Sequence, residues 1–182
     1  MQPNEIRNLA QSSQWIDSLR PRGSSEAFIL AWISWEGLKN RLLTYGFAKQ
    51  GYLAKDTVKA LRVCNVHSKS QYRAIFELAF GKHPLQVSKL GPVWREIESF
   101  QPMRNRIIHG GTGAKPDGLL RASRTISTHV LNTEWLEGAK IQINGINFVL
   151  ESPYKRIIAN RNPLRSYEEL LITFRSGLEH VN

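Results

Sequence analysis

The sequence contains little cysteine and no long uninterrupted apolar run. Only Cys64 among the 182 residues is a cysteine, so no disulfide can form within the chain, which is typical of a reducing compartment. The most apolar stretch, residues 27–35, is interrupted by Ser34, whereas a bilayer span needs about 18 to 20 apolar residues. No basic segment followed by an apolar one opens the chain, so no signal peptide is expected. We therefore expect a cytoplasmic protein with no membrane segment.

Motifs for metal binding, phosphate binding and nucleophilic catalysis are also missing. The five histidines are scattered, with no HExxH pattern, and Cys64 with His67 makes at most half of a zinc site. The glycine-rich residues 110–115 are not a Walker loop, because Pro116 follows Lys115 and a helical segment precedes them. There is no G-x-S-x-G nucleophile motif either. The sequence predicts no metal and no cofactor.

Acidic residues are scarce relative to basic ones. Fifteen Asp and Glu face 25 Lys and Arg, which gives a formal net charge of +10. Such an excess attracts polyanions, chiefly nucleic acid, with an anionic membrane surface as the weaker alternative. In residues 37–73, Asp56 is the single acid among eight basic residues: Lys39, Arg41, Lys49, Lys55, Lys59, Arg62, Lys69 and Arg73. This clustering favours a binding face over a uniformly solvated basic surface.

The length and the apolar content are those of an ordinary globular chain. An apolar fraction of 41% and 182 residues suffice to bury a core without disulfides or metals. At roughly 150 residues per domain, we expect a single domain over residues 1–182.

Apolar residues recur at three- and four-residue steps over most of the chain, which indicates helices with one buried face. The apolar positions of the first expected helix are Ile6, Leu9, Trp15, Ile16 and Leu19. A long second helix is expected to begin at Ser24 or Ser25, and its apolar positions are Phe28, Trp32, Trp35, Leu38 and Leu42. Leu30 and Ile33 lie on its other side, so its first half is either central in a bundle or shared with a partner.

Caps and prolines mark the later helices. Pro102 either kinks the helix before it or starts a new one. The expected segments are Asp56 through Leu61, Ser68 or Ser70 to Gly81, Pro92 to Phe100, Pro102 to His109, residues 119–136, and a last helix after the capping box 166–169. Alternating apolar residues flank Asn144-Gly145, a strong hairpin signal. The predicted fold class is an all-α helical bundle with a small β-hairpin near residues 140–150.

One polar segment stands out within the helical pattern. At 100° per residue, Asn105 and His109 share a helix face opposite Met103 and Ile107, so His109 is expected to face water, a ligand or another subunit. Arg104 lies about 140° around the helix from His109, and a bend or two copies meeting across a dyad would be needed to bring them together. The alternative is that His109 merely sits near a helix C-terminus, where its cationic form is favoured.

The segment Arg104-Asn105-Arg106-Ile107-Ile108-His109-Gly110 resembles the motif of the HEPN superfamily (higher eukaryotes and prokaryotes nucleotide-binding). Ribonuclease members carry Arg, four to six residues, then His, often with a polar residue after the Arg. Glu36 on the apolar second helix, with Arg41 beyond it, loosely matches a supporting pair of that family. The resemblance covers roughly residues 25 to 135.

The resemblance implies a metal-independent endoribonuclease that acts as a homodimer and leaves 2′,3′-cyclic phosphate and 5′-OH ends. Arg104, Asn105 and His109 would be catalytic and Glu36 and Arg41 supporting. Further RNA contacts are expected from Arg106, Lys115, Lys39 and Arg121. A toxin or phage-defence role with a cognate antitoxin or defence partner follows from the resemblance alone.

Two readings remain open beside the ribonuclease. Some HEPN toxins have a Tyr two residues after the His, where a partner modifies it, but this chain has Gly111 there. Other members have lost activity, so a non-catalytic module that binds RNA, nucleotides or proteins is the alternative. A structural dimerisation domain built on the apolar second helix is a weaker one.

Overall fold

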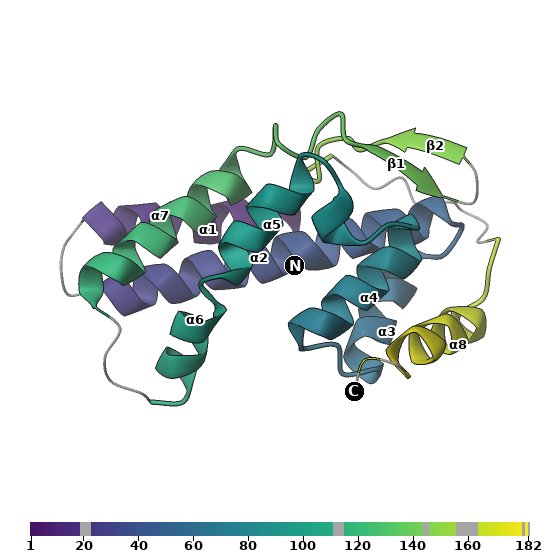
Figure 1. Cartoon of the computed structure of the whole chain (residues 1–182), viewed down its shortest axis with the longest axis horizontal. Coiled ribbons are helices and arrows are strands. Elements are labelled where there is room, and N and C mark those ends of the chain that lie inside the picture. The colour runs from purple at the N-terminus through teal and green to yellow at the C-terminus, as the bar shows by residue number, and fades with distance from the viewer. Residues whose placement is uncertain (19–22, 111–114, 144–145, 156–163, 180, 182) are drawn as a thin grey trace. The chain divides into compact units, whose positions relative to one another are not determined.

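The computed structural model describes residues 1–18, 23–110, 115–143, 146–155, 164–179 and 181 (Figure 1). The elements are α1 (Pro3–Ser18), α2 (Ser24–Lys49), α3 (Ala54–Val63), α4 (Lys69–Phe80), a short 3-10 turn η1 (Pro84–Gln86), α5 (Leu90–Glu98), α6 (Gln101–Ile108), α7 (Pro116–Leu131), β1 (Lys140–Ile143), β2 (Ile146–Val149) and α8 (Tyr167–Leu178). The predicted all-α class with one small hairpin is confirmed. In the described part of the chain, every helix is too short or too polar to cross a bilayer.

The chain divides into two compact units. The first comprises residues 1–39 and 92–135, and the second comprises 40–91 and 136–182, with α2 contributing to both. The prediction of a single domain over the whole chain stays a prediction.

Aromatic residues form the core of the first unit. The indole of Trp35 meets that of Trp94 edge-on with ring centroids 5.3 Å apart, and Trp135 lies at 6.4 Å on the same ring. The predicted apolar stripe of α2 is confirmed, because Phe28, Trp32, Trp35, Leu38 and Leu42 are all buried. Large side chains at helical spacing thus drive the burial of α2.

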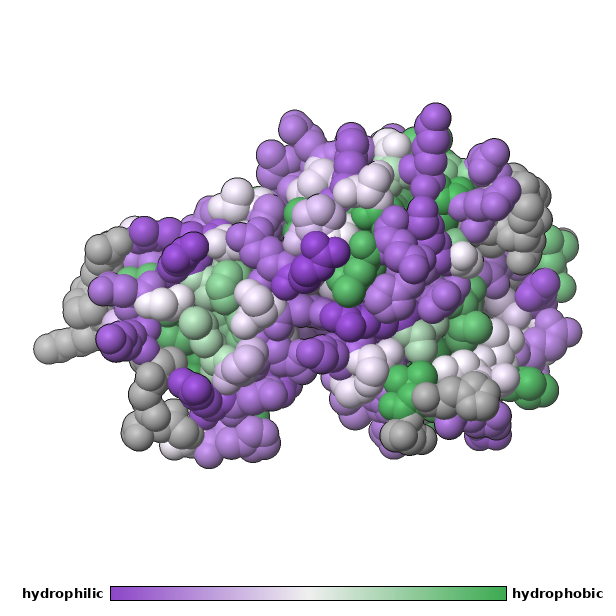
Figure 2. All heavy atoms as spheres, viewed as in Figure 1, coloured by the Kyte–Doolittle hydropathy of each residue, from purple (hydrophilic) through white to green (hydrophobic). Residues whose placement is uncertain are grey.

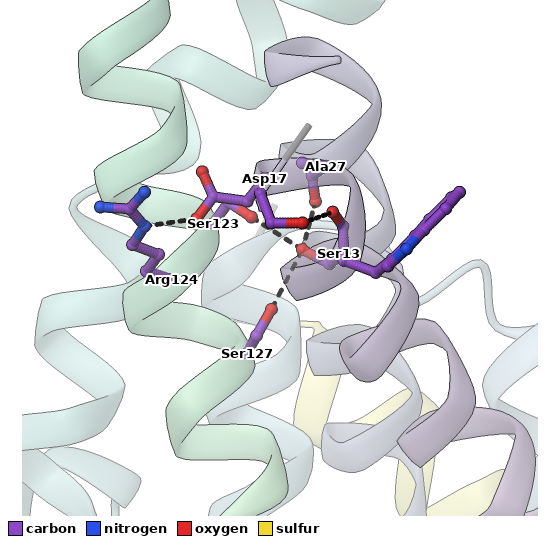
Figure 3. Close-up of polar contacts among 8 residues, drawn as sticks. Ser13, Asp17, Ala27, Ser123, Arg124 and Ser127 are labelled. Carbon is purple, nitrogen blue, oxygen red and sulfur yellow. Dashed lines mark hydrogen bonds and ion pairs between the residues drawn. The ribbon is translucent and has the colours of Figure 1, made fainter. Parts of the chain in front are cut away.

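The contact between α1 and α7 is polar, and Figure 3 shows it. The Ser13 hydroxyl donates to the carbonyl oxygen of Ala27 at 2.7 Å and accepts from the Ser127 hydroxyl at 3.1 Å. Its oxygen also lies 2.7 Å from that of Ser123, and Asp17 pairs with Arg124 one turn further along α1. These bonds satisfy buried hydroxyls and specify how the two helices align.

This polar contact corrects the expectation for Trp15. Trp15 was expected on the buried face of the first helix, but its side chain is 64% exposed. The face of α1 that is buried carries Ile6, Ala10, Ser13 and Asp17 instead. Their spacing is helical too, and the small side chains among them let α1 approach α7 closely, whereas Trp15 lies off this stripe.

The second unit combines helices and the hairpin. Phe47 of α2 packs on Phe174 of α8 with ring centroids 5.0 Å apart, and Phe76 packs on Phe80 within α4 at 4.4 Å. Gly46 permits the close approach of α2 and α4, because a Cβ there would lie 2.9 Å from the Cβ of Ala79. The predicted hairpin is confirmed, with Ile141 opposite Phe148 in an antiparallel ladder. Its expected turn, residues 144–145, lies outside the described residues.

Several predicted helix ends are confirmed. Ser68 caps α4 with a reciprocal capping box to Gln71, and Gly81 ends that helix in the left-handed region at φ 65°. Ser166 caps α8 by accepting the backbone N–H of Glu169. Pro102 starts α6 rather than kinking α5.

Two predicted ends are wrong. Asp56 does not cap α3, because the helix begins two residues earlier and Leu53 is its N-cap; Asp56 lies in the first turn, where a carboxylate still favours the helix dipole. The helix predicted to reach Leu136 ends at Leu131. Just beyond that end, the indole of Trp135 donates to the carbonyl oxygen of His129, which folds the chain back on the last turn.

Candidate functional site

The segment that carries the Arg-x4-His pattern forms α6 and the residue after it. None of the residues of α6 is buried, and the side chain of Ile108 is 51% exposed. Met103 and Ile107, which were expected to mark a core face, are only half-buried. A short helix with no buried side chain has little packing to hold it, so α6 is the least covered helix of its unit.

His109 lies at the exposed end of α6. Its backbone N–H donates to the carbonyl oxygen of Asn105 at 3.0 Å, which makes it the C-cap residue, and its side chain is exposed. Gly110 then leaves the helix at φ 69°. The expectation that His109 faces away from the core is confirmed, and its position also matches the alternative of a histidine that simply ends a helix.

Arg104 and Asn105 are brought together by a side-chain hydrogen bond. The Nη1 of Arg104 donates to Oδ1 of Asn105 at 3.2 Å. The Nε of Arg104 is buried and meets no hydrogen-bond acceptor among the described residues. Asn105 accepts from the arginine next to it, and its expected role of orienting His109 or a phosphate stays a prediction.

Lys39, which was expected to contact RNA, is buried rather than exposed, and its predicted role as an RNA contact stays a prediction. Its side chain is 8% exposed, and burial lowers its pKa from 10.5 to about 8. The carboxylates of Glu36 and Glu98 raise that pKa and the Arg104 charge lowers it further, so all three groups lie within electrostatic range of Lys39.

The sequence carries a signal for this burial. Lys39 follows Trp32 and Trp35 at the same helical spacing as the apolar positions before it, so it continues the buried stripe of α2. A charged residue at a core position is rare unless it is paired. A count of basic residues along the chain does not show this burial, because it ignores where each residue lies around the helix.

Two tryptophan–glutamate pairs support this cluster, and the sequence reading missed both. The indole of Trp32 donates to Oε1 of Glu36 at 2.8 Å, and that of Trp94 donates to Oε1 of Glu98 at 2.7 Å. Both pairs have the spacing Trp-x3-Glu, which places donor and acceptor on one helix face. Glu98 in particular was not among the expected site residues.

Arg41 binds elsewhere in the second unit. Its guanidinium donates to the carbonyl oxygens of Pro153 and of Lys155, the latter at 2.7 Å, and burial lowers its pKa. The side chain therefore holds the segment after the hairpin rather than a carboxylate. The supporting role expected for Arg41 stays a prediction.

The other expected RNA contacts lie on the surface of the first unit. Arg106, Lys115 and Arg121 are exposed. The first turn of α7 lies beside α6, because a Cβ at Gly118 would be 3.8 Å from Cε of Met103. Hydrophilic side chains cover most of the face shown in Figure 2, with smaller apolar areas between them. The expectations for Gly111 and the glycine-rich loop fall on residues 111–114, outside the described residues.

Metal ligands and reactive thiols offer no second site. In the described ranges, no three His, Cys, Asp or Glu side chains gather as a metal would require. Burial raises the pKa of the Cys64 thiol, which keeps it in its unreactive protonated form.

No protein-family model, no curated protein and no solved structure matches this chain. The likeness to HEPN proteins therefore rests on the segment 104–110 and its helical, basic context, and it stays a prediction.

Proposed function

We propose that this protein is a metal-independent endoribonuclease of HEPN type, in which Arg104 and His109 act on RNA. One observation carries the proposal: His109 is exposed at the end of a helix without buried residues, five positions after an arginine that is held by Asn105. A histidine or arginine that only stabilises the fold does not have to lie on an exposed helix. The net charge of +10 supports a polyanionic substrate.

The residue types match the chemistry of RNA cleavage. A neutral imidazole of His109 removes the proton of a ribose 2′-OH, whose oxygen then attacks the neighbouring phosphorus. The bond to the 5′ oxygen breaks, and the 5′ oxygen takes up a proton, which the imidazolium formed on His109 supplies through a water molecule. The products are a 2′,3′-cyclic phosphate and a 5′-OH end. Proton transfer by a positioned imidazole accelerates such a step roughly 10²- to 10⁴-fold.

Arg104 supplies the charge that this reaction needs. Negative charge builds on the phosphate oxygens as the 2′ oxygen attacks, and a guanidinium binds two such oxygens at once. The bond from Nη1 to Asn105 orients the guanidinium plane. Asn105 is thus assigned a positioning role toward Arg104.

The proposal requires two copies of the chain. Arg104 and His109 lie about 140° apart around a straight helix, so one α6 does not present both to a single phosphate. A twofold pairing of two α6 helices brings Arg104 of one copy toward His109 of the other and covers the exposed Ile108. The biological role is proposed on the resemblance to HEPN proteins alone. It is a toxin or phage-defence role in the cytoplasm, with an antitoxin or defence partner.

The deciding experiment is cleavage of single-stranded RNA by purified protein in EDTA, with analysis of the product ends. Arg104→Ala and His109→Ala are each expected to abolish cleavage while the circular dichroism spectrum is unchanged. His67→Ala is the matched control, because His67 is exposed on the second unit. Cleavage that survives in both Arg104→Ala and His109→Ala contradicts the proposal.

A second candidate, RNA binding without cleavage, is favoured by the surface of α3. Lys55, Lys59 and Arg62 lie on one exposed face at helical spacing, opposite the buried side of the helix. The ammonium of Lys59 lies 4.2 Å from the centroid of the Tyr167 ring, so an aromatic side chain accompanies the basic row. Basic rows with aromatic neighbours are typical of surfaces that bind single strands.

A further inference from the structure

The positive charge of the protein is unevenly divided between its two units. The first unit, which contains α6, carries 10 Lys and Arg against eight Asp and Glu. The second unit carries 15 Lys and Arg against seven Asp and Glu, and within its residues 40–91 nine basic residues meet only Asp56 and Glu77. A polyanion is attracted by the summed charge of the surface that it faces. Most of the attraction for a polyanionic substrate therefore comes from the unit that lacks Arg104 and His109.

Three of these basic residues form a row on the exposed face of α3. Lys55, Lys59 and Arg62 are all exposed, they lie within about 60° of one another around the helix, and they span about 10 Å along its axis. That span is close to the Debye length of about 8 Å at physiological ionic strength, so the three charges act together on one chain of phosphates. The one acidic residue of α3, Asp56, lies about 90° around the helix from the middle of the row. The exposed face of α3 therefore carries three cations and no carboxylate.

Two tyrosine rings hold cations of the second unit in place beside this row. The ammonium of Lys59 lies 4.2 Å from the ring centroid of Tyr167, the first residue of α8, which packs on α3 (Figure 1). Tyr52, two residues before α3, accepts a hydrogen bond at 3.2 Å from Nη1 of Arg165, whose guanidinium carbon lies 5.5 Å from the centroid of the same ring. A cation that rests on an aromatic ring keeps its other hydrogen-bond donors. Both groups are thus preorganised to bind phosphate oxygens, which lowers the entropy cost of binding.

The α3 surface comprises Lys55, Lys59, Arg62 and Arg165. We propose that this surface holds single-stranded RNA while α6 of the first unit acts on the scissile phosphate, so that the two units divide the reaction between them. The cations contact phosphates and read no base, because phosphate contacts position a strand without carrying sequence information. Contacts made far from the scissile phosphate hold the strand at lower concentration, which lowers KM. Binding on the α3 surface then serves cleavage instead of replacing it. This inference rests on the proposed function, since it assigns the cleavage step to α6.

Single-stranded RNA fits the α3 surface better than an anionic membrane does. A helix that lies on a membrane presents large apolar side chains such as Trp, Phe or Leu beside its basic ones. The exposed apolar side chains of α3 are those of Val58 and Val63. Leu164, next to Arg165, is exposed as well, but a single leucine adds too little apolar area to anchor the surface in a bilayer. A strand of RNA binds through its phosphates and needs no such anchor.

The test measures affinity for a strand that cannot be cleaved. A labelled single strand of 2′-O-methyl RNA lacks the attacking hydroxyl, so fluorescence anisotropy reports binding separately from cleavage. Replacing Lys55, Lys59 and Arg62 together by Ala is expected to raise Kd roughly 10- to 100-fold, because three charge-assisted contacts are lost. Two triple-alanine controls of equal charge are each expected to raise Kd by a clearly smaller factor, with unchanged circular dichroism spectra. They replace Arg104, Arg106 and Arg121 of the first unit, and Lys69, Lys82 and Lys89 of the second.

A second readout locates the bound strand. The same 2′-O-methyl RNA with 4-thiouridine in place of its uridines is cross-linked to the protein by light, and the modified peptides are identified by mass spectrometry. Adducts are expected on peptides that contain Tyr52 or Tyr167, because these rings lie beside the cations that bind the strand.

The outcomes separate this inference from the proposed function. An α3 triple variant that binds RNA as tightly as its controls, or adducts confined to α6, overturns the inference even if Arg104 and His109 prove catalytic. It is also overturned if the α3 variant loses binding to phosphatidylserine vesicles while its RNA affinity is unchanged. If the α3 variant loses RNA binding as expected but wild type does not cleave RNA, the proposed function fails and RNA binding by the α3 surface stands.

Discussion

The hydroxyl oxygens of Ser13 and Ser123 lie 2.7 Å apart, although 110 residues separate them in the chain. Ser13 also contacts Ala27 and Ser127, so one small side chain joins α1, α2 and α7. Asp17 and Arg124 form an ion pair one turn further along. These bonds decide how α1 and α7 align, because apolar packing alone would tolerate a slide of one helix along the other.

Ser13→Ala is expected to destabilise the fold. The substitution leaves the buried hydroxyls of Ser123 and Ser127 without their shared partner, which costs about 1 to 3 kcal/mol. The expected result is a fall in the melting temperature of roughly 2–4 °C per kcal/mol, measured by circular dichroism. Ser12→Ala, on the exposed side of α1, is the control and should melt like wild type. Equal melting of the two variants would show that the hydroxyl contacts contribute nothing.

Lys39→Met is expected to change how stability depends on pH. Because the pKa of Lys39 is lowered from 10.5 to about 8, the unfolded chain holds this proton more tightly between those values. The free energy of unfolding of the wild type therefore increases through this group as the pH rises from 8 to 10.5. The gain between pH 7 and 10 is on the order of 2 kcal/mol.

The measurement is urea unfolding of wild type and Lys39→Met at both pH values. The variant lacks this gain, so its stability relative to wild type should be larger at pH 7 than at pH 10. Lys82→Met removes an exposed lysine and is the control: its stability relative to wild type should not show this change with pH. A stability difference that stays constant with pH contradicts a depressed lysine pKa at this position.

Mixing inactive variants tests whether two copies share each site. If Arg104 of one copy works with His109 of the other, a heterodimer of Arg104→Ala and His109→Ala contains one intact site. Half of the dimers in an equal mixture are heterodimers, so roughly a quarter of the wild-type cleavage rate is expected to return. Each variant alone stays inactive. Mass spectrometry verifies that subunits have exchanged. If cleavage does not return after exchange, Arg104 of one copy and His109 of the other do not form a shared site.

The basic face of α3 predicts a specific change in salt dependence. Replacing Lys55, Lys59 and Arg62 together by Ala removes up to three phosphate contacts, so the slope of log affinity against log salt should fall by about 2 for a single strand. The measurement is fluorescence anisotropy with a labelled RNA. Lys69, Lys82 and Lys89, which are also exposed, form a matched triple-alanine control of equal charge. Equal slopes for the two triple variants would assign the effect to net charge alone.

Local sequence signals predicted the elements that depend on neighbours in the chain. The cap at Ser68 and the end at Gly81 follow from the chemistry of helix ends, which involves residues within one turn. The hairpin around residues 144–145 is likewise a local preference. The stripe of α2 was predicted because its aromatic residues are large enough to dominate any packing.

The candidate site was predicted only in part. The exposure of His109 followed from its position on the helix, since a polar side chain opposite apolar ones needs no further information. The bond between Arg104 and Asn105 did not follow, because two side chains adjacent in the sequence do not normally face each other on a helix. The burial of Lys39 could be expected from its place on the stripe of Trp32 and Trp35, but not from its charge.

By itself, the sequence determined the helical class, the hairpin, the basic charge and the Arg-x4-His segment, all of which depend on residue type and spacing. Only the tertiary structure decided which face of α1 is buried and that Lys39 is buried. It placed Trp15 in solvent and Ser13 inside, because the fit between two helices depends on the small residues that let them approach. It also buried Lys39 and so lowered its pKa, because desolvation is a property of the surrounding chain and not of the lysine.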